Sequence, residues 1–160
     1  MPSRVRRAVL GDVESLARLE RRAFRGYYAP HRFTTQQFAR YLESPRAIVY
    51  VVVQDGVVAG YVLGIRHTGR HSDLARLSSI AVDPLFQSRG FARRLLTAFL
   101  RTARRRGCRV AVLEVAGRNR RARALFEQHG FVTWRRLPDY YSPGVDGIRM
   151  RRGLAERRAP

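Results

Sequence analysis

The middle of the chain holds the pattern that most constrains its fold. Leu74 to Val82 is a β-branched, apolar run that stops before Pro84, and an amphipathic helix is predicted over Arg89 to Arg106. Gly107 suits the C-cap of that helix, and Arg109 to Val115 has the composition of a second strand. A strand, a helix and a strand in this order predict one βαβ crossover in a mixed sheet.

The turn that opens this helix, Gln87 to Ala92, has the features of an anion-binding site. The first N–H groups of a helix lack internal partners and lie at the positive end of the helix dipole. Gly90 lets a phosphate approach the backbone closely, and Arg89 adds positive charge. The turn therefore predicts a pyrophosphate cradle for a nucleotide-bearing ligand. The alternative is a strand–turn–helix junction whose glycine serves packing alone.

Hydrophobic periodicity predicts the remaining elements. Strands are expected at Val5 to Val9, Ala47 to Val53, Val57 to Ile65, Phe131 to Leu137 and Gly147 to Arg152; helices are expected after Gly11-Asp12, from Thr34 or Thr35 to before Pro45, and over Arg118 to His129. Loops are expected over Gly26 to Phe33, His67 to Asp73 and Pro138 to Asp146. This order predicts an α+β (mixed α/β) fold, with a central, mostly antiparallel twisted sheet of about seven strands and about four flanking helices.

Composition narrows the class of protein. We expect a single domain over residues 1–154 and a frayed tail over 155–160. No membrane span or signal peptide is expected. The single cysteine, Cys108, follows Gly107 at a strand start and is expected to be a buried structural thiol in a cytoplasmic protein. No metal site is expected, because His67 and His71 lack a clear third ligand.

The formal net charge of +20 invites a nucleic-acid interpretation. The sequence contains no lysine, so all 32 basic residues are arginine. Such complete replacement indicates a genome-wide bias in composition, and the arginines are spread over most of the predicted helices. Dedicated nucleic-acid binding is therefore not expected, although an RNA- or ribosome-associating protein stays open as an alternative that depends on charge alone.

Four motifs together resemble the GNAT superfamily of acetyl-CoA-dependent N-acetyltransferases. They are the Gln87-x-x-Gly90-x-Ala92 turn, the preceding Ile80-Ala81-Val82-Asp83-Pro84, the pair Leu113-Glu114-Val115 and Arg118-Asn119, and the run Ala124-Leu125-Phe126-Glu127-Gln128-His129-Gly130-Phe131. The resemblance covers nearly the whole chain and is closest to the bacterial RimI-type enzymes, which acetylate protein N-termini. Their Tyr-Tyr substrate loop resembles Pro138 to Gly144 here.

The resemblance implies which residues bind acetyl-CoA, the co-substrate. Ile80, Ala81 and Val82 would present backbone groups to the pantetheine arm, and the N–H of Val82 would stabilise the developing oxyanion. Asn119 would contact the co-substrate near its sulfur. The pyrophosphate would be held by Ser88, Arg89, Gly90, Phe91, Ala92 and Arg93.

Two carboxylates are candidates for the general base that takes a proton from the attacking amine. Glu114 ends an apolar strand beside the predicted co-substrate, and the family resemblance implies that role for it. The alternative is a strand-end acid that pairs with an arginine. Glu20 is the second candidate, and its alternative is a solvated helix face among arginines.

The sequence departs from the family at Phe126, where RimI-type enzymes carry a tyrosine assigned as the acid that protonates the leaving thiolate. Phenylalanine has no proton to donate, so the acid is unassigned, and Phe126 is expected to pack against the pantetheine. Tyr140 and Tyr141 are expected to line the acceptor channel; the alternative is an ordinary turn between Pro138 and Pro143.

These observations predict an N-acetyltransferase that transfers acetyl directly to a primary amine in a ternary complex. The expected acceptor is a protein or peptide N-terminus, in keeping with a ribosomal protein. A lysine side chain or a small amine is the second choice. A non-catalytic acyl-CoA-binding sensor is an alternative of another class, motivated by Phe126. No membrane partner is expected, and the oligomeric state is expected to be a monomer or homodimer.

Overall fold

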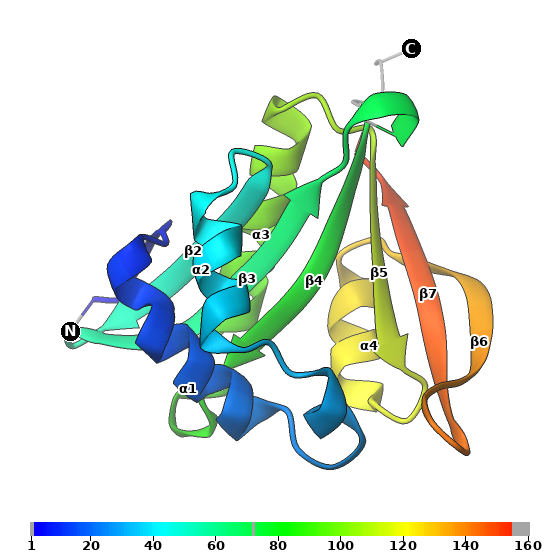
Figure 1. The fold of residues 1–160 in the computed structure, drawn as a ribbon, viewed down its shortest axis with the longest axis horizontal. Coiled ribbons are helices and arrows are strands. Elements are labelled where there is room, and N and C mark those ends of the chain that lie inside the picture. Colours follow the sequence, from blue (N-terminus) through cyan, green and yellow to red (C-terminus); the bar gives the residue numbers. More distant parts are fainter. Residues whose placement is uncertain (1, 72, 155–160) are drawn as a thin grey trace. The chain divides into compact units, whose positions relative to one another are not determined.

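A computed structural model describes residues 2–71 and 73–154; the tail expected at 155–160 lies outside the described residues. Its elements in chain order are β1 (Arg4–Arg7), η1 (Leu10–Asp12), α1 (Val13–Ala23), η2 (Gly26–His31), α2 (Thr35–Glu43), β2 (Ala47–Gln54), β3 (Val57–Arg66), η3 (Gly69–His71), β4 (Leu74–Val82), η4 (Pro84–Phe86), α3 (Phe91–Arg105), β5 (Val110–Ala116), α4 (Arg120–Gln128), β6 (Val132–Ser142) and β7 (Val145–Gly153), where η denotes a short 3-10 helix. The predicted fold class, with seven strands and four α-helices in the described ranges, is confirmed (Figure 1).

The strands form one sheet in the order β1-β2-β3-β4-β5-β7-β6. The pairs β1–β2, β2–β3, β5–β7 and β6–β7 are antiparallel, whereas β4 and β5 are parallel. The predicted βαβ crossover is therefore present, with α3 as its helix. The chain divides into two compact units, one of Met1–Ile65 and Leu77–Phe99 and the other of Arg66–Arg76 and Leu100–Pro160.

Local polar contacts stabilise the first turns of η1 and α2. Asp12 is buried, accepts a hydrogen bond from the N–H of Val9 at 2.8 Å and forms an ion pair with Arg6. Thr34 is the N-cap of α2: its hydroxyl accepts from the N–H of Gln37 at 3.2 Å, and the Gln37 side chain accepts from the N–H of Thr34 at 2.8 Å. This reciprocal capping box fixes the start of α2 at the residue after Thr34.

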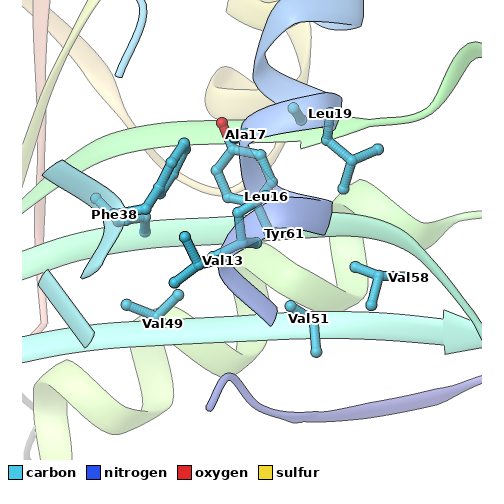
Figure 2. Close-up of a cluster of buried hydrophobic side chains, with 11 residues drawn as sticks. Val13, Leu16, Ala17, Leu19, Phe38, Val49, Val51, Val58 and Tyr61 are labelled. Atoms are coloured by element: carbon cyan, nitrogen blue, oxygen red, sulfur yellow. The ribbon is translucent and has the colours of Figure 1, made fainter. Parts of the chain in front are cut away.

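The core of the first unit is formed where α1 and α2 pack on the strands (Figure 2). Its buried members are Val13, Leu16, Ala17 and Leu19 of α1, Phe38 of α2, Val49 and Val51 of β2, Val58, Tyr61 and Leu63 of β3, and Ala81 of β4. Each fully buried aliphatic side chain of this kind contributes about 1.5–3 kcal/mol to folding. The same core therefore holds α1 against the end of β4.

A tight turn connects the neighbouring strands β2 and β3. Asp55 and Gly56 join β2 to β3 with φ angles of 53° and 74°, as the Asp-Gly hairpin signal predicts.

The prediction of a loop over Pro138 to Asp146 was wrong, because β6 continues to Ser142 and β7 begins at Val145. The sequence is misleading here because β6 accommodates Pro138 at a register shift between Leu137 and Ser142.

Candidate active site

The predicted pyrophosphate turn is built between β4 and α3. Asp83 caps η4 by accepting from the N–H of Leu85 at 2.9 Å, and its own N–H donates to Ala59 at 2.8 Å. Ser88 and Gly90 then adopt φ angles of 64° and 78°, in the left-handed region. These two residues redirect the chain into the first turn of α3, so the helix begins at Phe91, two residues later than predicted.

This turn has the charge and exposure that an anion needs. Gln87, Ser88, Arg89 and Gly90 are all exposed. The first turn of α3, all of whose residues the structure describes, carries no acidic side chain. A Cβ added to Gly90 would meet no atom within 4 Å, so the space above the backbone is open. Free N–H groups at a helix N-terminus beside arginine favour phosphate binding.

The end of β4 lies against β3 within the first unit. Side chains alternate, so that Ala81 is buried while Ile80 and Val82 are half-buried. Gly60 of β3 permits this approach, because a Cβ there would lie 2.9 Å from the carbonyl oxygen of Ala81. The backbone of β3 therefore approaches closely the strand end that the family resemblance assigns to the pantetheine arm.

Glu114 lies on β5 between two arginines of neighbouring strands. Nη1 of Arg76, on β4, donates to both carboxylate oxygens, at 2.5 Å for Oε2. Nε of Arg149, on β7, donates to Oε1 at 3.1 Å. The side chain of Glu114 is 10% exposed. The ion pair considered as the alternative for this residue is therefore present in the structure.

This pairing leaves Glu114 with one free acceptor position. A carboxylate has about four lone-pair positions for hydrogen bonds. Arg76 and Arg149 use two of them on Oε1 and one on Oε2. One lone pair of Oε2 therefore stays available for a water molecule or an amine. The ion pair and a base role for Glu114 are compatible in geometry.

Glu20 has the opposite surroundings within the first unit. It is 2% exposed, on the buried face of α1. The hydroxyls of Tyr61 and Ser79 donate to its Oε2, the latter at 3.1 Å, and the N–H of Phe33 donates to Oε1 at 3.2 Å. Burial raises the pKa of Glu20 to about 7, although these hydrogen bonds and the charge of Arg32 oppose the shift. The alternative interpretation, in which Glu20 lies on a solvated helix face, was wrong.

The other predicted residues of the second unit have structural partners. Asn119 is the N-cap of α4, and its side chain accepts from the N–H of Ala122 at 3.2 Å. Phe126 is 3% exposed and packs edge-to-face on Phe131, with ring centroids 5.8 Å apart.

Tyr140 and Tyr141 belong to the end of β6 rather than to a loop. Their rings meet edge-to-face at 5.0 Å, and Tyr140 is 45% exposed. A Cβ on Gly147 of β7 would lie 2.9 Å from the Tyr140 side chain, so the glycine leaves the room that this side chain needs. The exposed ring of Tyr140, packed on the half-buried Tyr141, suits contact with a substrate chain.

The predicted site residues fall into two groups. The first unit holds Glu20, Ile80 to Val82 and Ser88 to Arg93, and the second holds Glu114, Asn119, Phe126, Tyr140 and Tyr141. Sequence reasoning missed Arg76 and Arg149 as partners of Glu114; for Arg76, the one charged residue of β4, that isolated charge is a usable signal. It also missed Tyr61 and Ser79, the partners of Glu20, for which one sequence offers no signal. Within the described residues, no group of three or more His, Cys, Asp or Glu side chains is placed to hold a metal ion.

Comparison with known proteins confirms the resemblance. Residues 13–131 match the model of the acetyltransferase (GNAT) family. The chain is 34% identical over 143 residues to the Mycobacterium tuberculosis protein named N-alpha-acetyltransferase RimI, with 88% of this chain and 86% of that protein covered. It is 42% identical over 77 residues to the Haemophilus ducreyi ribosomal protein bS18-alanine N-acetyltransferase, a match that spans 48% of this chain and 52% of that relative.

A solved structure shows the same architecture over the full length. The crystal structure of the ribosomal-protein-S18-alanine N-acetyltransferase from Escherichia coli has a TM-score of 0.85 and 25% sequence identity, and the match covers 98% of this chain and 97% of that one. The family model, the relatives and the fold agree with the arrangement of strand, turn and helix described above. The chain belongs to the GNAT family of acetyltransferases.

Proposed function

We propose that this acetyltransferase moves acetyl from acetyl-CoA to the N-terminal amine of a protein, in a ternary complex and without a covalent enzyme intermediate. The observation that carries the proposal is the exposed turn of Ser88 to Gly90, which opens α3 with its free N–H groups in a chain 34% identical to an N-alpha-acetyltransferase. Relatives named for acetylation of an alanine support the choice of acceptor, because alanine has no amine other than its α-amino group.

The residue types at the predicted positions support acetyl-CoA as the co-substrate. Ser88, Arg89, Gly90, Phe91, Ala92 and Arg93 would hold the pyrophosphate through backbone N–H groups and guanidinium charge. Ile80, Ala81 and Val82 would bind the extended pantetheine arm along the strand end. Asn119 would contact the co-substrate near its sulfur, and Phe126 would pack against the pantetheine. The N–H of Val82 would donate to the carbonyl oxygen as it gains negative charge.

Glu114 is the proposed general base. The neutral amine attacks the thioester carbon, the new C–N bond forms, and Oε2 of Glu114 takes the excess proton directly or through water. The C–S bond then breaks and CoA leaves as a thiolate. Glu20 is the weaker candidate, because its carboxyl is sealed from solvent, at 2% exposure.

The leaving thiolate needs no acid from Phe126 in this proposal. A thiol has a pKa of about 8.5 if it resembles cysteine, so the thiolate can leave unprotonated and take its proton from water. Phe126 is buried on Phe131 and has no proton to give. Tyr140 and Tyr141 are proposed to line the acceptor channel, where the exposed ring of Tyr140 would contact the incoming peptide.

Calorimetry with acetyl-CoA and a CoA-release assay test the proposal together. We expect acetyl-CoA binding, CoA release with peptides that carry a free N-terminus, and loss of turnover in Glu114→Gln. Absence of acetyl-CoA binding would refute the proposal. Binding without turnover on any amine would favour the acyl-CoA sensor, and turnover only on N-terminally blocked peptides with lysine would favour side-chain acetylation.

The proposal also covers the extent of the domain, the cellular location and the oligomeric state. We propose one catalytic domain over residues 1–154, acting in the cytoplasm on a protein acceptor such as a ribosomal protein, as a monomer or homodimer without dedicated nucleic-acid binding. Cys108 is a buried free thiol whose pKa is raised by burial, which fits a structural role. None of the described helices has the length and apolar character to span a bilayer.

A further inference from the structure

Two arginines meet at the carboxylate proposed as the general base. On β5, Glu114 is the register partner of Arg149, and Val112, two residues earlier on the same face, is the register partner of Arg76. Alternation along each strand therefore places both arginines on the face of the sheet that carries Glu114. The three side chains come from three adjacent strands of the second unit, so their placement is set by the sheet itself.

The charges of this group do not balance. Two guanidiniums face one carboxylate, which leaves one unit of positive charge. The side chains of Arg76 and Arg149 are 34% and 26% exposed, compared with 10% for Glu114. The positive charge is therefore the part of the group that a solute can reach, and the net charge of +20 on the whole chain attracts acidic solutes further.

The two arginines also have unused donors. Arg76 reaches Glu114 through Nη1 and Arg149 through Nε. Among residues 2–71 and 73–154, neither guanidinium has a hydrogen-bond acceptor besides Glu114, so Nη2 and Nε of Arg76 and both Nη groups of Arg149 stay available. Guanidinium groups pair best with a second planar anion, that is, with another carboxylate.

We propose that Arg76 and Arg149 form a carboxylate-binding position beside Glu114, which selects acceptor N-termini that carry Asp or Glu as the first or second residue. The proposal rests on the proposed function, since Glu114 marks where the acceptor amine must lie. A side-chain carboxylate within two residues of that amine is near enough to reach the spare donors. A basic residue at the same place would meet the surplus positive charge.

Matched peptides test this selection. Pairs that differ only by Asp or Asn, at the first or at the second residue, are compared by kcat/KM. We expect the Asp peptide to be faster by about tenfold at one of the two positions, the value of one charge-assisted hydrogen bond. That position identifies the residue that is read. An Arg peptide should be slower than the Asn peptide, and added salt should reduce both differences.

Variants then assign the selection to the arginines. Arg149→Met and Arg76→Met should each lower the Asp-to-Asn ratio to below about threefold, whereas Arg149→Lys should keep part of it. The ratio is the proper readout, because any change in the basicity of Glu114 affects both peptides equally. Arg101→Met is the matched control: Arg101 is exposed on α3, and its loss should leave the ratio unchanged.

The outcomes separate this inference from the function on which it rests. Efficient acetylation of both peptides at a ratio near one would overturn the inference and leave the proposed function standing. A ratio that survives in both Met variants would also overturn it. Failure to acetylate any N-terminal peptide, with acetyl-CoA bound, would overturn both.

Discussion

Glu20 and Glu114 are both carboxylates among apolar residues, yet the burial and the hydrogen-bond partners of the two side chains differ. Glu20 is sealed in the core of the first unit, and its direct partners are two hydroxyls and one backbone N–H. Glu114 lies on the sheet of the second unit between two guanidiniums, and one lone pair stays free. Burial raises the pKa of Glu20 and so favours its protonated form, against the pull of its hydrogen bonds. The two carboxylates therefore differ in their surroundings rather than in residue type, which is the basis for proposing only Glu114 as the general base.

The largest expected effect comes from removing the carboxylate of Glu114. Glu114→Gln should lower kcat by about 10²–10⁴-fold, the usual contribution of a general base, with the Kd for acetyl-CoA little changed. Glu20→Gln should lower kcat by less than about tenfold, because that carboxyl is buried at 2% exposure, away from any incoming amine. Single-turnover rates with one peptide measure both. The distinction between the two carboxylates would be refuted if Glu20→Gln lowered kcat more than Glu114→Gln does.

The pH dependence of stability provides the second test. The pKa of Glu20 is about 7 in the folded protein and about 4.5 ordinarily, so the folded state binds the proton more tightly. Its stabilising contribution is therefore complete below about pH 4.5 and is lost as the pH rises through about 7, by about 3 kcal/mol in all. Urea unfolding of the wild type and of Glu20→Gln from pH 5 to 8 should differ by this slope. Parallel curves would refute a buried, protonated Glu20.

Proton accounting supports that direction independently. Oε2 of Glu20, the hydroxyl of Tyr61 and the hydroxyl of Ser79 contact one another pairwise, with Tyr61 and Ser79 2.8 Å apart. Three mutual hydrogen bonds among three oxygens need three protons. Only the protonated carboxyl supplies the third: its O–H donates to one hydroxyl, that hydroxyl donates to the second, and the second donates back to Oε2. The charged form, to which both hydroxyls donate, leaves the Tyr61–Ser79 pair without a proton between them.

Tyr61→Phe sharpens this part of the comparison with a smaller effect. The variant keeps the buried ring, which packs edge-to-face on Phe38 at 5.6 Å, and removes only the hydroxyl beside Glu20. We expect a loss of about 1–2 kcal/mol at pH 8, where Glu20 is charged and depends on its donors. The loss should shrink at pH 5.5. Ser79→Ala is the control for the second hydroxyl, and a pH-independent loss in both would contradict the account.

How much of the fold and of the candidate site could be predicted depends on how far apart in the sequence the contacting residues lie. The strand pattern, the Asp55-Gly56 hairpin and the crossover depend on local signals, and the structure confirms them. The loop expected at Pro138 was wrong, because a register shift lets the strand continue past it. The surroundings of Glu20 and Glu114 depend on partners far away in sequence, such as Ser79 and Arg149, and no local pattern marks a partner 59 or 35 residues away.

The smallest expected effect concerns the turn of Ser88 to Gly90, the proposed pyrophosphate site. Gly90 has a φ of 78° with open space above it, so Gly90→Ala meets no clash and suffers only from its backbone conformation. A left-handed alanine costs about 1 kcal/mol, and the added methyl group stands where a phosphate would approach. We therefore expect a modest loss of stability and a several-fold weaker Kd for CoA. Gly11→Ala, which has open space and an ordinary φ, is the matched control. Equal effects on CoA binding in both variants would show that the turn is a packing junction alone.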